Sequence, residues 1–228
     1  TRYWTKTGTH YFTAFIEGQD LEFVQGSDRD SDGLSFDTAT LDVQYQPDIL
    51  YAFAERDMAG HEPSEPVVLD FIHVFSAIKI NITNVNRPSL KITSYGFDRM
   101  VSKGKFTVTR GGGLDYDLNS VGEAYSQGSA EISLNAGETA TLYVGQSNVD
   151  PEGRLLVWPQ ELDDDLVLSF SYKDDSGANK TDVHLKTTDI VRWNAGFCYV
   201  YNITMSDNNI NFTVSIVPWE VNDVIIER

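Results

Sequence analysis

Cysteine is almost absent from this sequence, which removes the covalent cross-link that many small exported domains depend on. The 228-residue chain has one cysteine, Cys198, so no disulfide can form within it. Cys198 lies in the apolar run Phe197–Tyr201, and no basic residue beside it would favour the thiolate. We therefore expect a buried, unreactive thiol rather than a catalytic nucleophile.

Long hydrophobic runs are also missing. No stretch approaches the roughly 20 apolar residues that a membrane-spanning helix needs. The chain does not begin with Met, and Thr1–Trp4 does not resemble the start of a signal peptide. We interpret the sequence as a processed or shortened form from which any targeting segment has been removed.

Positive charge is scarce. The 17 Lys and Arg residues face 34 Asp and Glu residues, which gives a formal net charge of −17. A field of this sign repels phosphate backbones and anionic lipids, so nucleic acid is excluded as a partner. The hydrophobic fraction of 41% and charged fraction of 22% are typical of a globular protein rather than a disordered one. A length of 228 residues favours two domains.

Catalytic signatures are absent. None of the histidines is spaced from another as zinc ligands on one element would be; they are His10, His61, His73 and His184. Asp70 stands three residues from His73, so the two would face opposite sides of a strand. Asp182 and His184 would share a face, but no Gly-x-Ser-x-Gly nucleophile accompanies them, and a surface cross-strand role fits better. We predict no enzymatic activity and no cofactor.

The sharpest local pattern is acidic. Asp28, Asp30 and Asp32, followed by Gly33, match the first half of a calcium-binding loop. The match then fails, because Ala39 stands where the loop requires its twelfth-position Glu. A solvated acidic turn is the favoured interpretation, and the calcium loop is the alternative.

Alternation of apolar and polar residues with a period of two runs through most of the chain and predicts an all-β protein. Asn-x-Thr triplets at Asn81, Asn179, Asn202 and Asn211 fit the polar, β-branched outer faces of such strands. One segment, Val67–Ile82, is too long and too apolar for an ordinary strand. We expect it to bend near Ser76 and to pass from an N-terminal domain, residues 1–72, into a C-terminal domain, residues 73–228.

Exposed aromatic side chains could stack on sugars. Trp158 and Trp219 lie in or beside apolar strands, so we expect them in the core. Trp193 precedes a turn at Asn194–Gly196 and is expected to be the most accessible tryptophan and the candidate ligand-binding residue.

Several segments, in order along nearly the whole chain, together resemble the fimbrillin family, the type V pilins of Gram-negative gut and oral anaerobes. No single motif is specific, and the ordered set carries the resemblance. The segments are Tyr11–Phe15, Asp70–Ile80, Leu155–Gln160, Leu166–Tyr172, Trp193–Thr204 and Pro218–Trp219.

The resemblance implies a fold of two tandem transthyretin-like Greek-key β-sandwich domains, with the family's first N-domain strands preceding position 1. It also implies a fimbrial location at the cell surface or outer membrane, with anchoring only through a lipidated N-terminus that is removed. The implied partners are other fimbrial subunits, joined by donor-strand exchange, and a host or bacterial surface ligand.

The last residues fit two roles. Val221, Val224, Ile225 and Ile226 could form a donor strand for a neighbouring subunit, or the last strand of their own domain. The segment after Trp219 is short for a dedicated donor, which favours a minor or tip subunit. A surface glycan-binding lipoprotein is the alternative function.

Overall fold

The structure, a computed structural model, is all-β wherever it describes the chain. It describes residues 7–16, 23–25, 34–36, 48–59, 66–101, 104–108, 112–118, 123–127, 131–142, 154–162, 167–173, 176–186 and 190–219, and no helix occurs in these ranges. The strands are β1 (Thr9–Ile16), β2 (Phe23–Gln25), β3 (Leu34–Phe36), β4 (Leu50–Asp57), β5 (Phe71–His73), β6 (Ser76–Asn84), β7 (Ser89–Met100), β8 (Lys105–Val108), β9 (Leu114–Asp117), β10 (Glu123–Gln127), β11 (Ile132–Asn135), β12 (Thr139–Leu142), β13 (Leu155–Val157), β14 (Val167–Lys173), β15 (Asn179–Lys186), β16 (Phe197–Met205) and β17 (Ile210–Pro218).

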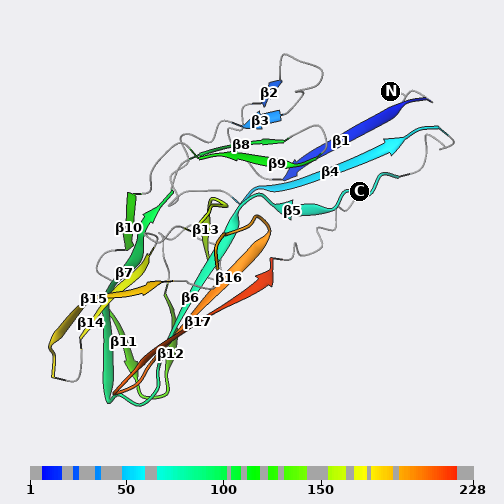
Figure 1. The fold of residues 1–228 in the computed structure, drawn as a ribbon. Coiled ribbons are helices and arrows are strands. Elements are labelled where there is room, and N and C mark those ends of the chain that lie inside the picture. Colours follow the sequence, from blue (N-terminus) through cyan, green and yellow to red (C-terminus); the bar gives the residue numbers. More distant parts are fainter. Residues whose placement is uncertain are drawn as a thin grey trace.

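Two sheets pack face to face in one half of the molecule (Figure 1). The first, which we call the central sheet, has the order β12-β6-β16-β17, with β13 also paired to β6. The second has the order β10-β7-β14-β15, with β11 also paired to β7. Alternation explains the packing, because Ile78, Ile80 and Ile82 of β6 and Tyr199 and Tyr201 of β16 all point to the same buried face. These side chains form the core between the two sheets.

The other half of the molecule contains a sheet of order β1-β4-β5 and a sheet of order β2-β3-β8-β9 (Figure 1). Strands β8 and β9 follow residue 73 in the sequence, yet β8 pairs with β3. The division into domains at residues 72 and 73 stays a prediction. A second core, which we call the junction core, lies where the central sheet meets this half. It contains Ile49, Tyr51, Val74, Phe75, Ala77, Phe106, Leu156, Trp158, Cys198 and Trp219.

The long apolar segment passes from one half of the molecule to the other. Its first part is β5, which pairs with β4, and its second part is β6, which pairs with β16. The expected irregularity near Ser76 is confirmed and falls at Val74 and Phe75, which are both fully buried between the two strands. The Val74 carbonyl accepts a hydrogen bond from the Tyr116 hydroxyl at 2.7 Å, so a buried backbone group at the break has its partner.

A glycine at the edge of the junction core leads to a stability prediction. Gly112 has φ = 79°, and a Cβ added there would lie 2.6 Å from Cγ of Phe53. Left-handed backbone costs a non-glycine residue about 1–2 kcal/mol, and overpacking adds to this penalty. We therefore expect Gly112→Ala to lower the unfolding free energy by about 2–3 kcal/mol, measured by urea denaturation.

Gly8 is the matched control for Gly112. It also has a positive φ, 90°, but an added Cβ there would meet nothing within 4 Å. Gly8→Ala should show the backbone penalty of about 1 kcal/mol alone. Equal losses for the two variants would contradict the packing argument at Gly112.

Candidate functional site at the junction core

Two tryptophan-containing segments that stand far apart in the sequence are joined beside the junction core. The backbone N–H of Gln160 donates to the Trp193 carbonyl at 3.1 Å, and the Trp193 N–H donates back to Gln160 at 2.9 Å. The buried Gln160 side chain adds three bonds: its Oε1 accepts from the Val101 N–H at 3.0 Å, and its Nε2 donates to the Trp158 carbonyl at 3.1 Å and to the Val101 carbonyl at 3.4 Å. Gln160 therefore has a structural role, because its backbone holds the two segments together and its side chain bonds to Val101 and Trp158.

Trp193 is buried, so the expectation that it is the most accessible tryptophan is wrong. Its side chain has no exposed surface, and its Nε1 donates to the Tyr201 hydroxyl at 2.8 Å. The indole also meets the Phe97 ring edge-on at 5.6 Å. Burial raises the pKa of Tyr201 well above its ordinary value, so its hydroxyl stays protonated. A fully buried ring offers no face for a sugar, and the structure gives no support to ligand binding at Trp193.

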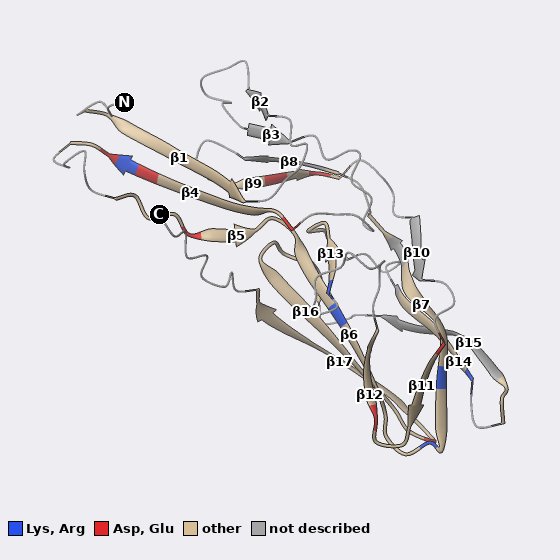
Figure 2. Cartoon of the chain, turned by 180° about the vertical axis from the view of Figure 1, so that it is seen from behind, with Lys and Arg blue, Asp and Glu red and all other residues tan. Residues whose placement is uncertain are grey.

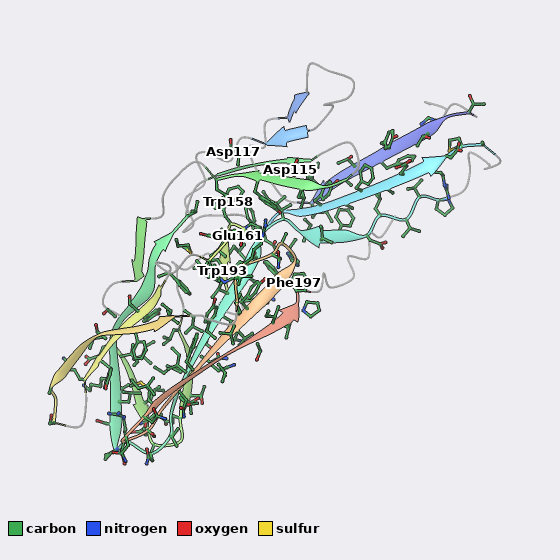
Figure 3. All side chains as sticks on the ribbon, viewed as in Figure 1. Asp115, Asp117, Trp158, Glu161, Trp193 and Phe197 are labelled. Atoms are coloured by element: carbon green, nitrogen blue, oxygen red, sulfur yellow. The ribbon has the colours of Figure 1, made fainter. Side chains whose placement is uncertain are left out.

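The other two tryptophans in the described ranges lie in the core, as expected. Trp158 is fully buried and Trp219 is 6% exposed. Trp158 meets the ring of Phe75 edge-on at 4.9 Å, a favoured aromatic geometry. Figure 3 shows Trp158 and Trp193 in the interior, between the strands. Cys198 is also buried, as expected, and forms no disulfide.

A histidine beside the junction core, His73, has partners that the sequence did not indicate. His73, 5% exposed, places Nδ1 2.7 Å from Oδ1 of Asp48. Its ring lies flat on Trp219, with ring centroids 3.6 Å apart and an interplanar angle of 6°. The Arg154 guanidinium lies 5.0 Å from the centre of the same indole, within cation–π range.

The strand that leads to Trp219 is an uncharged sheet edge. In the described part of the chain, β17 pairs only with β16, and neither strand contains a charged residue (Figure 2). The outer end of this pair carries exposed apolar side chains: Phe197 is 38% exposed, Ile216 52% and Val217 43%. Figure 3 shows Phe197 at that end of β16. Natural edge strands usually carry charges that block further pairing, and β17 carries none.

Comparison with known families identifies the chain. Residues 1–219 match the model of the fimbrillin-like family. The chain belongs to this family. A search of curated protein sequences found no match.

Solved structures show the same fold. One is a fimbrial protein from Bacteroides vulgatus, with a TM-score of 0.60 and 14% identity, over 91% of this chain and 77% of that one. Another is a proposed cell adhesion protein from Bacteroides uniformis, with a TM-score of 0.55 and 16% identity, over 96% of this chain and 76% of that one. At such low identities the likeness concerns the fold alone.

Family membership confirms the resemblance found in the sequence, and the structure assigns roles to its segments. The segment Asp70–Ile80 forms the passage between the two halves, and Leu155–Gln160 pairs with Trp193 beside it. Phe197–Met205 is the central strand β16, between β6 and β17. The family pattern in these segments is thus a pattern of packing and backbone pairing.

The remaining predicted site residues lie outside the described residues and stay predictions. They are the calcium-loop candidates Asp28, Asp30 and Asp32, and the donor-strand candidates Val221, Val224, Ile225 and Ile226. Within the described ranges, no three His, Cys, Asp or Glu side chains are grouped so that they could hold a metal ion. The same ranges contain no helix long and apolar enough to cross a membrane.

Proposed function

We propose that this chain is a structural and adhesive subunit of a cell-surface fimbria that joins its neighbours by strand exchange. Membership of the fimbrillin-like family implies a protein of a surface appendage. The observation that carries the assembly proposal is β17, a nine-residue edge strand without a charged residue in a chain of net charge −17. An acidic protein that leaves one long edge neutral keeps that edge suitable for another strand.

The physical basis of strand exchange is the addition of a strand to an open sheet edge. The outer N–H and C=O groups of the edge strand provide the affinity, and side chains at alternate positions provide the specificity. Exposed Ile216 and Val217 lie on opposite faces of β17, so an incoming strand would bury apolar surface on both sides.

The segment that would act as the donor is Val221–Ile226, directly after Trp219. The competing assignment makes these residues the last strand of their own chain. Under our proposal, the chain folds into two tandem transthyretin-like domains and is exported as a lipoprotein. It is a minor or tip subunit of the fimbria and has no enzymatic activity. Its partners are other fimbrial subunits and a surface ligand.

The donor role is tested by deleting residues 221–228. The shortened chain, with an epitope tag, is expressed in fimbriated cells that lack the native copy, and sheared fimbriae are probed for the tag. We expect the shortened chain to keep its unfolding midpoint and to be absent from the fimbriae. Incorporation at the level of the full chain would show that these residues are not the donor.

The edge role of β17 is tested by placing a charge on it. Ile216→Lys should abolish incorporation, because a lysine at the edge would lose its hydration when another strand docks. Val191→Lys is the matched control, since Val191 is 72% exposed and lies outside the strands. Normal incorporation of the Ile216→Lys chain would refute the assignment of β17 as the accepting edge.

A further inference from the structure

Trp219 is tied into the body of the protein by its backbone as well as its ring. Its N–H donates to the Gly196 carbonyl at 2.9 Å, and the Gly196 N–H donates to the Phe75 carbonyl at 3.1 Å. Trp219 is thereby connected through the turn before β16 to the break between β5 and β6. Residues 220–228 follow it in the sequence.

The stack of Trp219 on His73 is unusually close. Aromatic pairs in proteins usually prefer offset or edge-to-face arrangements with ring centres about 4.5–7 Å apart. Here the centroids are 3.6 Å apart and the planes nearly parallel, with both side chains buried. Such a geometry requires that each ring be held in place, and the Trp219–Gly196 backbone bond holds one of the two.

Asp48 holds the other ring. Its Oδ1 lies 2.7 Å from Nδ1 of His73, which fixes the plane of the imidazole. Nε2 of His73 is buried and has no hydrogen-bond partner. A buried polar atom without a partner is unfavourable, so packing alone does not explain a histidine at this position. A histidine at this position is explained if its ring has to stack on the Trp219 indole and be oriented there by the Asp48 carboxylate.

The charged groups on the stack are few in the described part of the chain. Asp48 contacts the imidazole edge, and its side chain is 39% exposed. Arg154 lies over the indole, 5.0 Å from its centre. The carboxylate and the guanidinium therefore contact different rings of the stack.

We propose that the His73–Trp219 stack is an anchor that fixes Trp219, the residue after which the chain continues to position 220, with Asp48 as its positioning residue. The consequence for assembly rests on the proposed function. A strand that follows Trp219 in the sequence starts from a defined position only if Trp219 itself is fixed in place, and a fixed start reduces the conformational entropy that is lost when the strand docks on a neighbour.

The anchor is tested on the purified monomer with a glutamate-specific protease. Cleavage after Glu220 requires several residues on each side of the bond to open, and its rate follows the population of that open form. We expect His73→Ala and Asp48→Ala to speed the release of residues 221–228 by about tenfold, followed by mass spectrometry. Glu161→Ala is the control, because it removes a carboxylate that pairs with Arg192 at 3.0 Å, away from the stack.

The outcomes are separable. Release from Asp48→Ala within twofold of the unmodified chain would overturn the anchor. Asp48 is partly exposed, so this variant decides the question even if His73→Ala fails to fold. The assay does not involve assembly: faster release together with normal incorporation of the chain lacking residues 221–228 would leave the anchor standing and refute the donor strand.

Discussion

Replacement of Trp193 by alanine is expected to lower the unfolding free energy by about 3–5 kcal/mol, which is typical of truncating a large, fully buried aromatic residue. The side chain has no exposed surface and packs edge-on against Phe97. The variant also removes the donor to the Tyr201 hydroxyl, leaving a buried polar group without its partner. Urea denaturation followed by circular dichroism measures the loss.

Substitution by phenylalanine separates the hydrogen bond from the packing. Trp158 and Trp193 are both fully buried, but Nε1 of Trp158 has no hydrogen-bond partner. Trp158→Phe therefore changes packing alone, whereas Trp193→Phe changes packing and removes the bond to Tyr201. We expect Trp193→Phe to be the more destabilising by about 1–2 kcal/mol. An equal or smaller loss would mean that this bond contributes nothing to stability.

The strands were predictable because their signals are local. Alternation identified the polar outer faces: Asn81 and Asn202, each in an Asn-x-Thr triplet, lie on neighbouring strands, and Nδ2 of Asn81 donates to Oδ1 of Asn202 at 3.0 Å. The passage between the two halves was predictable for a similar reason, because its length and apolar character exceed those of a single strand.

The errors and omissions concern partners that are distant in sequence. Trp193 precedes a turn, and turns usually lie at the surface. In the structure the backbone of Trp193 pairs with that of Gln160, and the indole N–H of Trp193 donates to the Tyr201 hydroxyl inside the core. The sequence around His73 offers Asp70 as a neighbour, whereas the partner of its ring, Asp48, lies 25 residues away. A single sequence contains no signal for such pairs, since they form only when the sheets pack.

The pairing of sheets is unpredictable for the same reason. Strands β6 and β16 lie side by side in parallel, with Asn81 opposite Asn202, although 121 residues separate the two. Parallel neighbours require a long connection, and nothing local specifies which strand follows it into the sheet. The uncharged sequence of β17 could be read directly, but its position at an edge could not.

Asn84 offers a second test with a large expected effect, at the turn between β6 and β7. Its side chain is fully buried and makes three hydrogen bonds to backbone groups. Nδ2 donates to the carbonyls of Leu134 at 3.0 Å and Arg87 at 2.9 Å, and Oδ1 accepts from the Arg87 N–H at 3.0 Å. The side-chain amide of Asn84 thus supplies hydrogen-bond partners to backbone groups of the turn and also links β11 to the turn.

We expect Asn84→Ala to lower the unfolding free energy by about 3–4 kcal/mol, because three hydrogen bonds to backbone groups are lost and the one to the Leu134 carbonyl is buried. Asn86→Ala, in the same turn, is the matched control: Asn86 donates to the Asp207 carboxylate at 3.2 Å and accepts from the Asp207 N–H at 3.0 Å, but both bonds are exposed to water, so the loss should stay below about 1 kcal/mol. Urea midpoints of the two variants decide the matter. If they coincide, the turn does not depend on the buried amide, and the connection from β6 to β7 must be held by the packing of their two sheets alone.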